Sequence, residues 1–344
     1  MPNSQSVGLS EIQAARQRLA QLALPTPLLP SAALSAVCGQ PVLLKCEARL
    51  ATGSFKLRGA SNAVAVLGDA ARQRGLVTAS TGNHGRALAH AARIAGARAV
   101  VCMSHLVPAN KVAAVRALGA EIHLVGQSQD DAQAAVERLV EDQGLSEIPP
   151  FDHRDVIAGQ GTIGLEIAEA MPDLELVLVP LSGGGLAAGV AAAVKALRPR
   201  ARVVAVSMAR GAAMHASLAA GKPVAVAELP TLADSLGGGI GLTNRYSFAL
   251  CRALLDDVIL LSEEEIAAGI RHAFTADGET VEGAGAVGIA ALLAGKVTAR
   301  GPVAVLLSGD NIDPAVHRSI VAGSWTATAT ATATAPCRRQ AALH

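Results

Sequence analysis

The feature that most restricts the fold of this chain is a repeated alternation of short β-rich runs with alanine-rich stretches of helical spacing. Such alternation predicts an α/β protein in which a parallel sheet is covered by helices on both faces. Helices are expected to begin near Ser54, Arg86 and Asn110. The expected strands are residues 42–46, 76–80, 99–104, 122–125 and 174–180.

The segment GLSEIPPFDH, residues 144–153, interrupts this alternation and indicates a crossing between two domains. A chain of 344 residues with 51% hydrophobic content can bury a large core, and about two domains are expected. From Ser324 onward a Thr-Ala repeat lacks any core-forming pattern, so we expect residues 324–344 to form a disordered tail.

Charge and hydropathy argue against two classes of partner. The formal net charge of +1, with no basic stripe, argues against nucleic acid. The polar start and the absence of any apolar run of about 18 residues argue against a membrane, and we expect a cytoplasmic protein. The five cysteines form no C-x-x-C pair and are expected to be reduced thiols.

The stretch GSFKLRGASN, residues 53–62, places Lys56 in the first turn of an expected helix. The positive end of the helix dipole opposes an ammonium there, at a cost of a few tenths to about 1 kcal/mol. Together with burial, this favours the neutral amine, the form in which a lysine attacks a carbonyl. A helical lysine is most often a solvated surface residue, so a catalytic role for Lys56 is inferred only from its combination with the motifs that follow.

The strongest of these motifs is LVLVPLSGGGLAAG, in which a strand runs through Ser182 and residues 183–185 into an alanine-rich helix. Glycines let backbone amides approach a phosphate closely, and a helix N-terminus adds a favourable potential. The same residues fit a dinucleotide site of the G-x-G-x-x-A type. That site needs an acid at the end of the next strand, where this chain has Ser207 and Met208. Tight packing of the loop is a third interpretation.

Two further strand ends carry polar turns, the position at which open α/β sheets bind ligands. In ASTGNHGRALAHAAR, hydroxyl, amide and free backbone N–H groups converge and would suit a carboxylate. An ordinary N-cap made of Ser, Thr and Asn explains the same pattern equally well. In VAVLLSGDNID, Ser308 directly follows an apolar strand, although Ser-Gly is a common turn.

Together, the lysine and these turns indicate a cofactor that carries one phosphate and a carbonyl able to react with an amine. From about Glu11 to Ile320 the chain resembles the fold-type II pyridoxal-phosphate enzymes of the serine/threonine dehydratase and serine racemase group. The motifs that carry the resemblance are SFKLRGA, STGNHGRALA, VIAGQGTIGLEI, PLSGGGLAAG, VEGAGAVGIAAL and LLSGDNID. Within that group, CMSHLVPANKV, SQDDAQA and TLADSLGGGIGL are most similar to the hydroxyectoine-utilisation dehydratases, which are threonine dehydratase-like.

The resemblance implies pyridoxal 5'-phosphate as the cofactor and a role for each matching residue. Lys56 would form the internal aldimine and later move the Cα proton, and Thr81 occupies the second acid–base position. Phe55 would stack on the cofactor ring, Asn83 would meet its 3′-hydroxyl and Ser308 its pyridine nitrogen. The phosphate would be held by Ser182, Gly183, Gly184, Gly185 and Leu186, and the substrate by Ser80, Thr81, Asn83, His84, Asp234 and Gly238.

The resemblance also implies a tryptophan synthase β-like fold, with two open, twisted, mostly parallel sheets and helices on both faces of each. Residues 1–74 and 149–323 would form the large cofactor-binding domain, and residues 75–148 a small mobile domain that closes over the substrate. The implied assembly is a homodimer that acts on a small-molecule amino acid.

The implied reaction removes water from a β-hydroxy amino acid to give a keto acid and ammonia, in hydroxyectoine degradation if the subgroup holds. A hydroxyl at the ring nitrogen, in place of a carboxylate, should leave that nitrogen unprotonated and favour elimination over a long-lived carbanion. The alternatives are a serine-type racemase and a non-catalytic protein that binds the cofactor or an amino acid. Similar racemases use a serine where this chain has Thr81, whose extra methyl restricts χ1.

Two departures from the family pattern qualify this assignment. Where relatives place the carboxylates of a divalent cation site, AVSMARGAAM offers Ser207, Gly211 and Ala213, so no metal requirement is expected. The histidines show no zinc-ligand spacing either. In the small domain, GQSQDDAQA holds Asp130 and Asp131 where relatives often present an arginine. This pair could suit a distal amine on the substrate, but solvated acids at a helix start are the favoured explanation.

Overall fold

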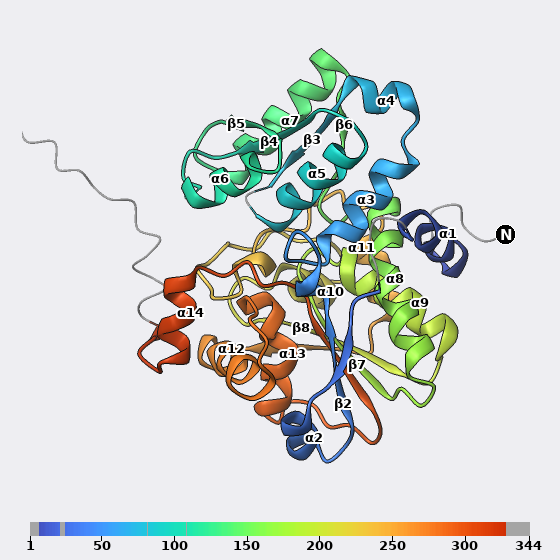
Figure 1. Ribbon diagram of the computed structural model, residues 1–344, viewed down its shortest axis with the longest axis vertical. Helices are drawn as coiled ribbons and strands as arrows, with labels where there is room; N and C mark the ends of the chain where they lie inside the picture. The colour runs from blue at the N-terminus through green and yellow to red at the C-terminus, as the bar shows by residue number, and fades with distance from the viewer. Residues whose placement is uncertain (1–6, 21–24, 81, 108, 328–344) are drawn as a thin grey trace, which may run out of the picture.

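The computed structural model describes residues 7–20, 25–80, 82–107 and 109–327, which form an α/β protein with two sheets (Figure 1). The larger sheet has the strand order β1-β2-β10-β7-β8-β9, and its pairs are parallel except for the antiparallel pair of β1 with β2. Its strands are β1 (Leu28–Pro30), β2 (Val42–Cys46), β7 (Leu176–Pro180), β8 (Arg202–Met208), β9 (Asp257–Leu261) and β10 (Val303–Leu307).

The smaller sheet has the strand order β5-β4-β3-β6 and is parallel throughout. Its strands are β3 (Leu76–Ala79), β4 (Ala99–Met103), β5 (Glu121–Leu124) and β6 (Ser146–Glu147). The expectation of two mostly parallel sheets is therefore confirmed. The bounds and the mobility of the two predicted domains stay predictions.

Helices cover both faces of each sheet (Figure 1). No helix in the described ranges is both long and apolar enough to cross a bilayer. The helices are α1 (Leu9–Leu19), α2 (Ala32–Cys38), α3 (Lys56–Val66), α4 (Asp69–Arg74), α5 (Asn83–Ile94), α6 (Ala109–Arg116), α7 (Gln129–Gln143), α8 (Arg154–Ala170), α9 (Gly185–Leu197), α10 (Ala213–Ala220), α11 (Ser247–Leu254), α12 (Glu263–Asp277), α13 (Gly283–Leu293) and α14 (Pro314–Val321), with short 3-10 turns η1 (Glu47–Arg49) and η2 (Asp234–Leu236).

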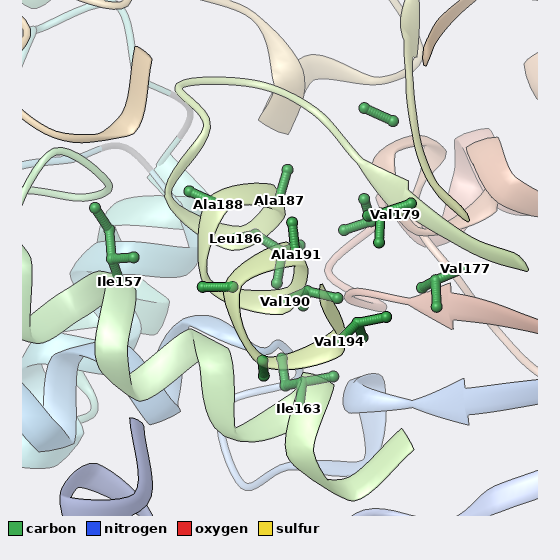
Figure 2. Close-up of a cluster of buried hydrophobic side chains, with 14 of the residues drawn as sticks. Ile157, Ile163, Val177, Val179, Leu186, Ala187, Ala188, Val190, Ala191 and Val194 are labelled. Carbon is green, nitrogen blue, oxygen red and sulfur yellow. The ribbon is translucent and has the colours of Figure 1, made fainter. Parts of the chain in front are cut away.

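The larger sheet lies between two apolar layers because successive residues of its strands point to opposite faces. In β7, Val177 and Val179 belong to the cluster formed with α8 and α9, whereas Leu176 and Leu178 belong to the cluster formed with α12 and α13. Figure 2 shows the first of these clusters, with β7 side chains beside those of α8 and α9. Each fully buried valine or leucine contributes about 1.5–3 kcal/mol relative to an exposed one, which makes the sheet a rigid base for its loops.

Helices α8 and α9 cross closely because glycines stand at their contact. A Cβ atom on Gly164 would lie 2.6 Å from the carbonyl oxygen of Val190, and one on Gly189 would lie 2.4 Å from that of Ile157. Neither backbone atom can move aside easily, so larger residues would push the two helices apart. The glycines of VIAGQGTIGLEI thus help to set the position of α9.

The predicted crossing segment is partly wrong, because its first part is a strand. Ser146 and Glu147 form β6 and pair with Leu76 and Val77 of β3. Two residues are too few to show the alternation by which a strand is recognised in a sequence. The chain crosses from the smaller to the larger sheet only after Ile148.

Two helix starts also differ from the prediction. Helix α3 begins at Lys56, because Ser54 forms an isolated bridge with Gly309 and the Phe55 amide donates to the Ser308 carbonyl. Helix α5 begins at Asn83, one turn before Arg86, since the Gly85 amide is capped by the Ser80 hydroxyl. The predicted strand that ended at Ser80 ends at Ala79 for the same reason.

The prediction of a tail from Ser324 onward is wrong for its first two residues. The Ser324 and Trp325 amides both donate to the Ser319 carbonyl, and Trp325 packs against the apolar cluster under α12 and α13. A tryptophan buries a large apolar area, so Trp325 belongs to the folded part of the chain. Residues 328–344 of the predicted tail lie outside the described residues.

Candidate functional site

A cavity of about 530 Å³ lies where the loops after β3, β7 and β10 meet the start of α3. This volume suits a small molecule or a cofactor with its substrate. Every described residue to which the resemblance gave a role toward the cofactor or substrate lines it. These residues are Phe55, Lys56, Ser80, Asn83, His84, Ser182, Gly183, Gly184, Gly185, Leu186, Asp234, Gly238 and Ser308. Thr81 lies outside the described residues.

Lys56 lies in the first turn of α3, as its sequence pattern predicted, although the helix begins at Lys56 itself and not near Ser54. Its Nζ donates a hydrogen bond of 2.7 Å to the Pro150 carbonyl and lies 5.2 Å from the centroid of the Phe55 ring. Burial lowers the pKa of Lys56 to about 8, although the Glu282 carboxylate acts in the opposite direction. A substantial fraction of this amine is therefore neutral and nucleophilic near pH 8.

Strand pairing brings Ser308 beside the lysine loop. β10 runs parallel to β2, with Leu307 opposite Cys46, so the loops after the two strands leave the sheet together. The Phe55 amide then donates to the Ser308 carbonyl at 3.0 Å. Residues more than 250 positions apart in the printed sequence thus form one wall of the cavity.

The glycine-rich loop after β7 is fixed from behind. A Cβ on Gly183 would lie 2.4 Å from the Phe151 ring, and one on Gly185 would lie 2.6 Å from the Phe151 carbonyl oxygen. Gly184 has φ +90°, which side chains other than hydrogen rarely permit. The Ser247 hydroxyl donates to the Gly183 carbonyl at 2.7 Å. The amides of the first turn of α9 have no acceptor within the helix, so they can hold an anion in the cavity.

The dinucleotide interpretation of this loop fails at the next strand. β8 ends at Met208, and the Ser207 hydroxyl donates to the Leu181 carbonyl. Neither side chain supplies the carboxylate that would bind a ribose hydroxyl. A single phosphate fits the loop better.

The start of α5 contains the capping contact that the sequence suggested, and a carboxylate site at this turn stays a prediction. The Ser80 hydroxyl accepts from the Gly85 amide at 3.0 Å, which is a capping contact. His84 is buried, and its Nε2 lies 2.8 Å from the Ile148 carbonyl oxygen. Burial lowers the pKa of His84 to about 3. The neutral ring must donate through Nε2 to that carbonyl, so Nδ1 carries no proton and only the His84 backbone amide can donate to a carboxylate.

Glu282 is a site residue to which sequence reasoning gave no role. It is the N-cap residue of α13, and its Oε1 accepts a hydrogen bond of 2.8 Å from Asn83 Nδ2. Burial raises the pKa of Glu282 to about 7, and the Asp234 carboxylate adds to the rise. An acid just before a glycine-rich helix, in VEGAGAVGIAAL, was the available signal.

The outer part of the cavity is polar, and sequence reasoning missed several of its residues. Lys111 of α6 forms an ion pair of 2.8 Å with Asp234 of η2. This contact joins the part of the chain built on the smaller sheet to the part built on the larger sheet. Other lining residues are Ser104, Gln127, Ser128, Gln129, Glu228 and Ser235. Asp130 and Asp131 do not line the cavity. The Asp131 carboxylate instead caps α7 by accepting from the Gln127 and Ser128 amides.

The stretch that corresponds to a cation site in relatives has other tasks here. Ser207 is buried, Gly211 has a left-handed φ of +72°, and Ala213 begins α10. Within the described ranges, no three His, Cys, Asp or Glu side chains lie close enough together to hold a metal ion. Independence of added metal stays a prediction.

Comparisons with known proteins match this geometry. Residues 19–309 match the family model described as "Pyridoxal-phosphate dependent enzyme". A Sinorhizobium fredii protein named "Putative threonine dehydratase" is 60% identical over 94% of this chain and 98% of its own length. A solved threonine deaminase from T.th. has a TM-score of 0.82 at 38% identity, over 89% of this chain and 99% of that one. Maize serine racemase has a TM-score of 0.85 at 32% identity, over 92% and 98% of the two chains.

Proposed function

This chain belongs to the family of pyridoxal-phosphate dependent enzymes, and we propose that it is a dehydratase that removes water from a β-hydroxy amino acid. The products would be a keto acid and ammonia. The observation that carries the proposal is the meeting of a lysine amine, a glycine-rich anion loop and a serine hydroxyl in one cavity. Similarity to a threonine deaminase over most of both chains supports it.

The residues of the cavity fit the cofactor. The amides from Ser182 to Leu186 would hold its phosphate, because packing fixes this loop while its first-turn amides stay free of helical acceptors. Phe55 would stack on its ring, and Asn83 would meet its 3′-hydroxyl. When bound, the cofactor would draw electron density from the substrate Cα and make its proton acidic.

Lys56 would act as the base of the reaction. Its Nζ is the amine that would bind the cofactor and, once free, would take the proton from Cα. The pKa of about 8 suits this task, since a base works best when its pKa lies near the operating pH. The Pro150 carbonyl, which accepts from Nζ, would orient the protonated amine.

The start of α5 would hold the substrate carboxylate. The backbone amides of Asn83 and His84 point from a helix N-terminus, and Ser80 and Thr81 would add hydroxyl groups. Asp234 and Gly238, which line the cavity beyond this turn, would lie near the rest of the substrate.

Ser308 would decide between elimination and slower carbanion chemistry. Its hydroxyl is buried and lies at the end of β10, where it would meet the pyridine nitrogen. A hydroxyl does not stabilise a protonated ring nitrogen as a carboxylate does. Loss of the β-hydroxyl would then be the easier route.

The substrate would be a β-hydroxy amino acid of the diaminobutyrate type, formed in hydroxyectoine degradation. The resemblance of SQDDAQA and TLADSLGGGIGL supports this role. Asp130 and Asp131 cannot recognise a distal amine, because neither lines the cavity. Among the carboxyl groups that line the cavity, Glu282 accepts from Asn83 and Asp234 is paired with Lys111. Glu228 is therefore the carboxylate that would meet such an amine.

A racemase is the second candidate, favoured by the similarity to maize serine racemase. Both activities would begin with removal of the Cα proton, so product analysis separates them. We expect keto acid and ammonia from L-serine, L-threonine or a larger β-hydroxy amino acid. Chiral chromatography that detects D-amino acid forming faster than keto acid would assign the protein as a racemase.

The assembly and the location of the enzyme complete the proposal. We propose a cytoplasmic homodimer in which residues 75–148 move as a unit toward the rest of each chain. Light scattering of the purified protein tests the first point, and cell fractionation tests the second. Domain movement would show as a substrate-dependent change in small-angle scattering.

A further inference from the structure

A buried cluster of charged side chains lies at the contact of α3, the helix that begins at Lys56, with α8 and the end of β2. Its members are Lys45 at the end of β2, Glu47 in η1, Arg58 in α3 and Glu166 in α8. Lys45 and Arg58 are each 2% exposed and Glu47 is 0% exposed, so water does little to screen them. The two positive and two negative groups leave the cluster with no net charge.

Arg58 is the centre of this cluster. Its Nε and Nη2 donate to the two carboxylate oxygens of Glu47 at 2.7 and 2.8 Å. Nη1 and Nη2 donate to the two oxygens of Glu166 at 2.5 and 2.9 Å. The remaining contacts are with the Thr162 and Thr26 hydroxyls. All five N–H donors of the guanidinium are therefore used.

Lys45 completes the cluster from the sheet. Its Nζ donates to Glu166 at 2.5 Å and to the Thr26 carbonyl at 2.6 Å. Burial raises the pKa of Glu166, but Arg58 and Lys45 overcome this effect and hold it below its usual value. Glu166 thus stays ionised between two cations.

Close packing fixes the place of α3 as well. A Cβ on Gly159 of α8 would lie 2.7 Å from the Arg58 carbonyl oxygen, so the two helices touch backbone to backbone. Arg58 follows Lys56 by two residues in the same first turn. Side chains two positions apart point to different sides of a helix, so Arg58 faces α8 while Lys56 faces the cavity.

We propose that Lys45, Glu47, Arg58 and Glu166 form a positioning cluster for Lys56, which fixes the first turn of α3 and leaves no net charge behind the lysine amine. A buried ion cluster adds little stability over a well-packed apolar one, so stability alone does not explain its presence. A cluster that is both rigid and neutral holds the amine in place without altering how easily it takes a proton. The inference rests on the proposed role of Lys56 as the cofactor-binding amine.

Other groups that face Lys56 have to be held constant in a test. From α13, Glu282 raises the pKa of Lys56, and Asp234 acts in turn on Glu282. From α5, the neutral ring of His84 lies nearby, and it also interacts with His153 at the start of α8. None of these residues belongs to the cluster, so variants within the cluster leave them unchanged.

Removal of one charge from the cluster should shift the titration of Lys56 in a direction set by the sign of that charge. Arg58→Gln leaves one excess negative charge and should raise the pKa of Lys56. Glu166→Gln leaves one excess positive charge and should lower it. A unit charge on the order of 10 Å away, at an effective dielectric constant of about 20, shifts such a titration by about one pH unit.

The test measures how the rate of pyridoxal phosphate uptake by full-length apoprotein depends on pH, followed by visible absorbance. The neutral lysine is the reacting form, so the midpoint of the rate profile reports its pKa. Arg58→Gln should move the midpoint up by about one pH unit and Glu166→Gln should move it down. The double variant, which restores neutrality, should return it close to the original value.

Two controls separate this effect from damage to the fold. Arg16→Gln removes a cation that also pairs with a glutamate of α8, Glu169, but at the surface, and should leave the midpoint unchanged. Arg58→Lys keeps the charge and loses the two-pronged contacts, so it should slow uptake without moving the midpoint. If Arg58→Gln does not fold, Glu166→Gln and the double variant still carry the test.

Midpoints that stay fixed, or that move in the same direction for both single variants, would overturn the proposal. Circular dichroism of each variant shows whether it is folded. If uptake by the unaltered protein does not require Lys56, the proposed function fails instead, and Lys56→Ala distinguishes this outcome.

Discussion

Asn83, at the start of α5, donates a hydrogen bond of 2.8 Å to the buried carboxylate of Glu282, at the start of α13. The two residues are 199 positions apart in the chain and belong to different sheet units. The side-chain oxygen Oδ1 of Asn83 accepts in turn from Asn311 Nδ2. One carboxamide therefore joins the substrate turn, the acid beside the lysine and the loop after β10.

The stability of the protein should depend on the protonation of Glu282. Its pKa is about 7 in the folded state and 4.5 in the reference state, so the folded state binds more protons between these values and stability falls as pH rises across that window. Glu282→Gln removes this penalty and keeps an acceptor for Asn83. Denaturant unfolding should show the variant gaining up to about 3 kcal/mol over the unaltered protein at pH 8, and almost nothing at pH 4.5.

The exposed Glu264, at the start of α12, offers a matched control for this experiment. Its pKa is lowered by the Glu264 backbone amide and the Ser262 hydroxyl, so Glu264→Gln should not reproduce the gain at pH 8. If Glu282→Gln changed the free energy of unfolding by the same amount at every pH, the raised pKa of Glu282 would be contradicted.

The purified protein should be yellow through Lys56. Sodium borohydride should bleach the absorption, and Lys56→Ala should remove it. The same variant should lower the activity by at least about 10²-fold, the usual contribution of a positioned base. Absorption spectra before and after reduction make the comparison. A colourless protein that takes up no pyridoxal phosphate would end the enzyme assignment.

Glu228 should affect long substrates more than short ones. Glu228→Gln removes a carboxylate that lines the outer cavity, so KM for a diaminobutyrate-type β-hydroxy acid should rise about 3- to 5-fold, the size expected for a partly exposed ion pair. KM for threonine should not change. Glu137→Gln, on the exposed face of α7, is the control. A higher kcat/KM on threonine than on the longer acid would reject this substrate class.

The identity of residue 81 should influence the products. Thr81→Ser removes a methyl that restricts χ1, so the hydroxyl could reprotonate Cα from the face opposite Lys56. We expect the fraction of D-enantiomer formed from L-serine to increase, with keto acid still the main product of the unaltered enzyme. Chiral chromatography of both variants measures this ratio.

Catalysis should continue without added magnesium or calcium. The stretch AVSMARGAAM offers no carboxylate ligand for a hard cation. Exhaustive treatment with a chelator should therefore leave the rate of keto acid formation unchanged. Loss of activity that Mg²⁺ restores would disprove the argument.

Most of the fold was predictable because its strands are short, apolar and bounded by clear turns. The predicted strand at 42–46 matches β2, and Lys56 lies in the first turn of its helix as expected. β6 was missed because two residues show no period, and its partner β3 lies 70 positions earlier. The lysine, the glycine loop and Ser308 were found because each has a local pattern.

The rest of the site depends on contacts that no local pattern contains. Glu282 matters because it is buried beside Asn83, and the proton position on His84 depends on the Ile148 carbonyl, 64 residues away. Lys111 and Asp234 come from different sheet units. Such relations arise only when distant parts of the chain pack together, so a single sequence does not reveal them.

Helix α3 touches both halves of the molecule. Its residues Ala60, Ala63 and Val64 belong to the apolar cluster beneath the smaller sheet. Arg58 of its first turn is held by Glu47 of η1 and Glu166 of α8. If the smaller sheet moved relative to the larger one, as proposed, Asn83 and His84 would move with it, whereas Glu47 and Glu166 would hold the first turn of α3 in place. The Lys56 amine would then keep its position while the residues that meet the substrate moved toward it or away from it.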